Sequence, residues 1–97
     1  MRSVIFHPLA EQELLDVVHY YEQQETGLGL DYLGEVEHAV NFLVRYPEAG
    51  AKVRGTIRRL TLPKFPYFLL YRVVEEQIRV LAVAHNKRKP QIGRAHV

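Results

Sequence analysis

The sequence contains no cysteine, and this absence removes three kinds of chemistry at once. Its 97 residues can form no disulfide, no thiolate zinc site and no cysteine nucleophile. Ser3 is the single serine, and no glycine elbow or phosphate-cradling loop surrounds any serine, threonine or lysine, which argues against serine catalysis and P-loop chemistry. Nothing at the N-terminus resembles a cleavable signal or a membrane span, so we expect a cytoplasmic protein without a membrane partner.

The length suits one small domain, whereas the charge is unevenly distributed along it. We expect a single domain over residues 1–97. The net charge of +2 conceals a split, because residues 1–51 hold nine acidic residues against Arg2 and Arg45, a net charge of −7. Residues 52–97 hold eleven lysines and arginines against Glu75 and Glu76, a net charge of +9. The basic half is the part suited to an anionic or acidic partner.

The spacing of apolar residues predicts two helices and four strands. Helical periodicity runs from Pro8 to about Gln24 and, after the glycines at 27 and 29, up to Tyr46. Runs rich in β-branched and aromatic residues predict strands at residues 3–6, 56–62, 67–74 and 77–84. The order β-α-α-β-β-β favours an α+β two-layer sandwich, with a helical hairpin packed on a mainly antiparallel sheet. We expect a loosely ordered tail from about residue 90.

Alternation along the predicted strands brings several arginines toward the sheet face that the helices leave uncovered. Arg59 shares a strand face with Ile57, and Arg72 lies on the same face as neighbouring apolar residues of its strand. The same alternation places Arg79 and His85 together on one side of the last strand. Such a cluster could hold phosphates electrostatically, although arginines on a sheet face are also often merely solvated.

Two pairs of acidic and histidine residues have the spacing seen in helical di-metal sites. Asp16 precedes His19 by three residues, and Glu35 precedes His38 by three residues. That design requires four helices with inward-facing ligands, and only two helices are predicted here. We therefore interpret these side chains as solvent-facing and expect no metal and no cofactor.

Residues 58–72, followed by residues 78–85 and 88–90, resemble the RelE/ParE toxin superfamily. Four features recur together there: an arginine-led strand, a Phe-Pro-Tyr step at 65–67, a Tyr-Arg ending at 71–72, and a histidine followed shortly by arginine and proline. The resemblance covers roughly residues 3–90. It implies the same β-α-α-β-β-β architecture and the role of a type II toxin that is neutralised by a cognate antitoxin.

The resemblance leaves two targets open. RelE-like members cleave mRNA on the ribosome, and ParE-like members inhibit DNA gyrase. No tyrosine follows Tyr71 and no acid follows Glu76, so a nuclease would need His85 as acid or base. Arg59, Arg72 or Arg79 would stabilise the negative charge that develops on the RNA phosphate during cleavage. The His–Arg–Pro ending resembles the ParE type, so we favour gyrase, with mRNA cleavage as the alternative.

The charge of the basic half and the motif positions together predict which residues contact the target or RNA. They share a positive charge and lie in the basic half. They are Arg58, Arg59, Lys64, Arg72, Arg79, Lys87, Arg88 and Lys89.

Overall fold

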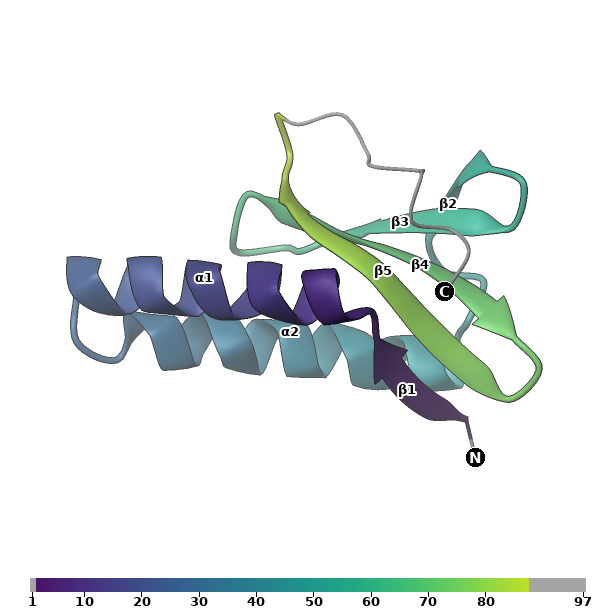
Figure 1. The fold of residues 1–97 in the computed structure, drawn as a ribbon, viewed down its shortest axis with the longest axis horizontal. Coiled ribbons are helices and arrows are strands. Elements are labelled where there is room, and N and C mark those ends of the chain that lie inside the picture. Colours follow the sequence, from purple (N-terminus) through teal and green to yellow (C-terminus); the bar gives the residue numbers. More distant parts are fainter. Residues whose placement is uncertain (1, 88–97) are drawn as a thin grey trace.

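The computed structural model describes residues 2–87 of the chain, which form two helices and five strands (Figure 1). In chain order these are β1 (Ser3–Phe6), α1 (Pro8–Gln24), α2 (Leu28–Arg45), β2 (Ala51–Arg54), β3 (Ile57–Thr61), β4 (Tyr67–Val74) and β5 (Gln77–His85). The strands form one sheet in the order β1-β5-β4-β3-β2, in which β1 is parallel to β5 and the other neighbours are antiparallel. The predicted α+β sandwich is confirmed. The tail predicted from about residue 90 lies outside the described residues.

One strand is absent from the sequence prediction. β2 pairs antiparallel with β3 across a turn in which Gly55 has a φ of 56°, the left-handed conformation that glycine adopts without strain. All four residues of β2 are exposed, and two of them are cationic. Because no residue of this strand is buried, its sequence lacks the alternation by which a half-buried strand is recognised.

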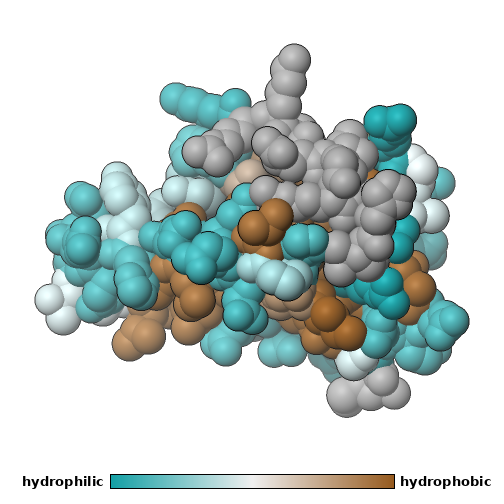
Figure 2. All heavy atoms as spheres, viewed as in Figure 1, coloured by the Kyte–Doolittle hydropathy of each residue, from teal (hydrophilic) through white to brown (hydrophobic). Residues whose placement is uncertain are grey.

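The two helices form a closely packed hairpin. Glu22 at the end of α1 holds the start of α2, because its carboxylate accepts hydrogen bonds from the backbone N–H groups of Gly27 (2.9 Å) and Gly29 (3.0 Å). Gly29 lies against the backbone of α1, where an added Cβ would collide with the carbonyl oxygen of Val18. Hydrophilic side chains predominate at the tip of this hairpin (Figure 2). No helix within residues 2–87 is long and apolar enough to cross a membrane.

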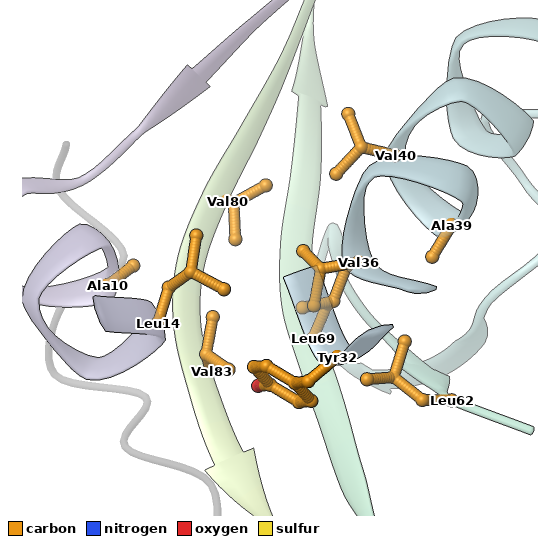
Figure 3. Packing of buried hydrophobic residues seen from close by; sticks show 10 residues of the cluster. All are labelled: Ala10, Leu14, Tyr32, Val36, Ala39, Val40, Leu62, Leu69, Val80 and Val83. Atoms are coloured by element: carbon orange, nitrogen blue, oxygen red, sulfur yellow. The ribbon is translucent and has the colours of Figure 1, made fainter. Parts of the chain in front are cut away.

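The hairpin covers one face of the sheet and buries the main hydrophobic cluster there. Figure 3 shows this cluster, which consists of Ala10, Leu14, Tyr32, Val36, Ala39, Val40, Leu62, Leu69, Val80 and Val83. Tyr32 is fully buried, and its ring lies 5.2 Å from that of Phe65 and 5.5 Å from that of Tyr67, measured between centroids. Aromatic packing therefore joins α2 to the start of β4.

A β-bulge in β5 changes which side chains face the helices. Leu70 pairs with Ala82 and Tyr71 pairs with Val80, so Leu81 is an extra residue on β5. From this point the alternation is shifted by one residue, and such a shift moves every following side chain to the other face. The prediction that placed His85 on the same side of the strand as Arg79 is therefore wrong.

The clusters on the two faces show this shift directly. Val80 and Val83 both belong to the cluster under the helices, although they are three residues apart. Leu81, Ala82 and Ala84 belong to a second cluster that contains no helical residue. β5 therefore presents Val83 and His85 toward α1, whereas Arg79 points to the second face of the sheet.

Candidate functional site

Three arginines from three neighbouring strands lie on the second face of the sheet, as the sequence predicts. Arg59 pairs with Leu70 of the second cluster, and its guanidinium carbon lies 4.1 Å from the ring centroid of Phe68. Arg72 and Arg79 are directly opposite each other in the β4–β5 ladder. We call the surface formed by Arg59, Arg72 and Arg79 the cationic face.

The pairing of Arg72 with Arg79 is electrostatically unfavourable by itself. Like charges placed directly opposite on neighbouring strands destabilise a sheet, and both side chains are partly buried. Arg79 donates a hydrogen bond from Nε to Oε1 of Gln77 at 3.0 Å, which helps to orient its guanidinium. Two adjacent guanidinium groups suit a carboxylate or a phosphate, since each presents several N–H donors to an anion.

Apolar side chains lie beside the cationic face. The second hydrophobic cluster occupies the same face of the sheet and consists of Ile57, Phe68, Leu70, Leu81, Ala82 and Ala84. The Arg59–Phe68 contact joins the two kinds of surface through a cation–π interaction. The residues of this cluster are buried, with exposed fractions of 8% or less, so the partly exposed arginines are the part of this face that suits an acidic partner.

His85 lies away from the cationic face in two respects. It points toward the helices, where its ring lies 5.1 Å from the ring of Tyr67 between centroids, and its Nδ1 accepts a hydrogen bond from the Lys87 N–H at 3.2 Å. It also lies six residues along β5 from Arg79, a distance of roughly 20 Å at the usual rise of about 3.3 Å per residue. His85 and Arg79 therefore lie on opposite faces of β5 and at a distance from each other along the strand.

Arg58 lies on the face of β3 that the helices cover, where it holds a loop in place. Its guanidinium donates hydrogen bonds to the backbone oxygens of Glu48 (3.1 Å) and Gly50 (2.8 Å), and it lies 3.9 Å from the exposed Glu48 carboxylate. Arg58 therefore has a structural contact with this loop, which its predicted role in target binding did not anticipate.

The remaining predicted cations are dispersed. Lys64 is exposed in the loop between β3 and β4, where its backbone N–H donates a hydrogen bond to the Glu35 carboxylate at 3.1 Å. Lys87 is exposed just beyond β5. Arg88 and Lys89 lie outside the described residues. Within residues 2–87, the structure therefore brings together Arg59, Arg72 and Arg79 but leaves the other predicted residues apart.

Sequence reasoning missed two residues with long-range polar contacts. The buried Tyr71 hydroxyl donates a hydrogen bond to the Pro47 oxygen (2.7 Å) and accepts one from the Gly50 N–H (2.9 Å). Glu13 of α1 accepts a hydrogen bond from the Val83 N–H of β5 at 3.1 Å. The partners are between 21 and 70 residues apart in sequence, so no local pattern identifies them.

The helical histidines do not form a metal site with their acidic neighbours. His19 and His38 are exposed on different helices, and Glu35 binds the Lys64 N–H instead. Among residues 2–87, no group of three or more histidine, cysteine, aspartate or glutamate residues is arranged to hold a metal ion.

The structure thus consists of two helices packed on one face of a five-stranded mixed sheet, with three arginines on the other face. The family model described as the ParE toxin of the type II toxin–antitoxin system, parDE, matches residues 4–90. The chain therefore belongs to the ParE toxin family and is a toxin of the type II toxin–antitoxin class.

Solved structures have the same fold at low sequence identity. A chain of the chromosomal ParDE toxin–antitoxin system from P. aeruginosa is 23% identical, with a TM-score of 0.72 and coverage of 88% of this chain and 96% of that one. The isolated E. coli RelE toxin is 19% identical, with a TM-score of 0.57 and coverage of 98% and 95% respectively. A search of curated proteins gave no match.

Proposed function

We propose that this toxin inhibits DNA gyrase by binding it, and that a cognate antitoxin neutralises the toxin. The observation that carries the proposal is the separation of His85 from Arg79 on β5. A nuclease needs its acid or base within hydrogen-bond reach of the phosphate that its cations hold. His85 points toward α1, whereas Arg72 and Arg79 point away from the helices, so the geometry favours a binding protein over an RNA-cleaving enzyme.

The cationic face is the surface that we propose for the protein contacts. Arg72 and Arg79 supply adjacent positive charges, and the second hydrophobic cluster lies beside them. An acidic antitoxin segment would pair with the two arginines, whereas the side chains of the cluster are already buried and support the guanidinium groups from beneath. The antitoxin would in this way compete for the surface that the toxin needs for its target.

The gyrase proposal is tested with purified gyrase, relaxed plasmid and the full chain. We expect loss of supercoiling activity, and the same loss with the His85→Ala variant. The double variant Arg72→Gln/Arg79→Gln should inhibit at least about tenfold less, because it removes both charges from the proposed contact. Lys52→Gln/Arg54→Gln on the exposed strand β2 is the matched control and should inhibit normally.

The thermal stability of these variants separates a lost contact from a lost fold. A cooperative thermal transition would show that the Arg72→Gln/Arg79→Gln variant is folded, even where its Tm is lower because contacts of the two guanidinium groups are lost. Normal supercoiling at a large molar excess of folded toxin would refute the gyrase target.

The mRNA alternative makes a different prediction in cells. On toxin induction we expect translated mRNA to stay intact, and we expect His85→Ala to arrest growth as the parent chain does. Mapping of mRNA ends before and after induction measures the first, and growth curves measure the second. Cleavage within translated messages that disappears in His85→Ala would replace the gyrase proposal with a ribosome-dependent endoribonuclease.

A further inference from the structure

A small cleft lies between α1 and the end of β5, apart from the cationic face. We call it the α1–β5 cleft and define it by Glu13, Asp16, Tyr67 and His85. Its volume of about 190 Å³ is below the roughly 300–1,000 Å³ of sites for small molecules, so it suits a single side chain better than a metabolite.

A buried hydroxyl group without a partner lies beside this cleft. Tyr32 is fully buried, and its hydroxyl has no hydrogen-bond partner within residues 2–87. The hydroxyl points toward Val83 of β5, and Val83 itself lines the cleft (Figure 3). Burying a hydroxyl without a hydrogen bond is unfavourable, which indicates that a further polar group reaches this position.

The groups that raise the pKa of Tyr32 include a residue of the α1–β5 cleft. Burial raises the pKa of Tyr32 most, and the neighbouring Tyr67 and Tyr21 and the Glu13 carboxylate raise it further. The hydroxyl is therefore in the electrostatic field of Glu13 and remains protonated at neutral pH. A neutral phenol oxygen can accept a hydrogen bond from a cationic donor.

The chemistry of the cleft selects a flat cation with several donors. Glu13 and Asp16 supply negative charge, and Glu13 is held at the cleft by its 3.1 Å hydrogen bond from the Val83 N–H. The ring of Tyr67 offers an aromatic surface, and the Tyr32 oxygen offers an acceptor. A guanidinium group can bind the carboxylates, the aromatic ring and the acceptor oxygen together, because it pairs with carboxylates, stacks on aromatic rings and presents N–H donors in several directions.

We propose that the α1–β5 cleft binds an arginine guanidinium group. One source is Arg88 of this chain, which is three residues after His85 in the sequence. The described chain ends close to the cleft, because Asn86 donates its N–H to the Pro66 oxygen and Lys87 donates its N–H to Nδ1 of His85. The other source is an arginine of a bound protein, and the experiment below distinguishes the two.

The first arm measures thermal stability in a double-mutant cycle. If Arg88 is the source, Arg88→Met and Glu13→Gln each lower the Tm by about 4 °C or more, and the double variant loses clearly less than the sum. The Gln side chain can still accept the Val83 N–H, so Glu13→Gln removes the charge and keeps that hydrogen bond. Lys89→Met and Glu11→Gln are the matched controls and should show no coupling.

The second arm titrates N-acetyl-L-arginine amide into the isotope-labelled full chain and follows the Val83 amide signal by NMR. If Arg88 is the source, saturable shifts occur only in Arg88→Met. If a bound protein is the source, they occur in the parent chain. Glu13→Gln should abolish the shifts in both cases, and Glu11→Gln should preserve them.

Tyr32→Phe provides an independent check. If the guanidinium donates to the Tyr32 oxygen, this variant weakens binding of the arginine amide or, with Arg88 as the source, lowers the Tm. With Arg88 as the source, a higher Tm would contradict the proposal, because it would mean that the hydroxyl is simply unsatisfied. With a bound protein as the source, unchanged binding of the arginine amide to Tyr32→Phe would contradict it. Additive effects of Glu13→Gln and Arg88→Met together with no saturable shift in either protein would also overturn it.

Discussion

At the scale of single residues, Tyr71 and Arg58 hold the connection between α2 and β2. The Tyr71 hydroxyl binds the Pro47 oxygen and the Gly50 N–H, and Arg58 binds the Glu48 and Gly50 oxygens. Because these contacts satisfy backbone groups that the loop cannot pair internally, two side chains of the sheet determine the path of the loop.

Tyr71→Phe should lower the free energy of unfolding by about 1–3 kcal/mol, since it leaves a buried N–H and a carbonyl oxygen without their partner. Urea denaturation monitored by circular dichroism measures this change. Tyr46→Phe, at an exposed tyrosine, is the matched control and should change stability by less than about 0.5 kcal/mol. Equal effects of the two substitutions would show that the Tyr71 hydrogen bonds do not stabilise the loop.

Buried tyrosines also predict a loss of stability at alkaline pH. Burial raises the pKa of both Tyr32 and Tyr71 above the usual value of about 10. Above about pH 10 the unfolded chain therefore releases protons that the folded chain retains, so the stability present at lower pH decreases as the pH rises. Thermal melts between about pH 8 and pH 11 should show a falling Tm.

The contribution of one tyrosine is isolated by comparison with Tyr32→Phe. This variant has no phenol to titrate at position 32, so its Tm should fall less steeply with pH than that of the parent chain. Parallel pH profiles for the two proteins would contradict the raised pKa of Tyr32.

At the scale of elements, two glycines of α2 have opposite environments. An added Cβ at Gly29 would meet the backbone of α1 at Val18, whereas one at Gly34 would meet nothing within 4 Å. Gly34→Ala should therefore stabilise the chain by about 0.5–1 kcal/mol through helix propensity. Gly29→Ala should destabilise it, because the helices must move apart. The difference in Tm between these two variants measures how closely α1 and α2 are packed.

The bulge in β5 is the element-scale feature with the largest consequence for function. By adding Leu81 it turns Val83 and His85 toward α1 and leaves Arg79 on the second face. An alternating pattern read from sequence assumes a regular strand, so it assigned His85 to the wrong face.

At the scale of the whole molecule, charge is separated between the two layers of the fold. Both helices belong to residues 1–51, which have a net charge of −7, and strands β3, β4 and β5 belong to residues 52–87, which hold eight lysines and arginines against two glutamates, a net charge of +6. The fold thus turns a charge gradient along the chain into a difference between its helical layer and its sheet. Such a distribution orients an approaching acidic partner toward the sheet.

This separation predicts a salt-dependent association with an acidic antitoxin. Between about 50 mM and 500 mM salt, the association rate should fall by about tenfold or more while the dissociation rate changes much less. Stopped-flow mixing with the antitoxin measures both rates. The Arg72→Gln/Arg79→Gln variant should show a weaker salt dependence than Lys52→Gln/Arg54→Gln. The opposite ranking would show that the antitoxin contacts a surface other than the cationic face.

The sequence by itself determined six of the seven elements in their order, the two-layer architecture and the family. Strands at residues 3–6 and 67–74 and the helix from Pro8 to Gln24 follow from patterns that repeat within a few residues. Such patterns are read locally, because each element buries one of its own faces. The arginine-led strand and its Phe-Pro-Tyr step were likewise enough to indicate the RelE/ParE superfamily, which the family match confirmed.

Only the tertiary structure decided the inclusion of β2, the face on which His85 lies, and the long-range contacts of Tyr71 and Glu13. The exposed strand β2 exists because β3 offers it hydrogen-bond partners, and its own residues carry no burial pattern. The position of His85 depends on one extra residue in the β4–β5 register. Each of these features is a relation between segments distant in sequence, and pairing across the sheet selects it through hydrogen bonds that no single segment contains.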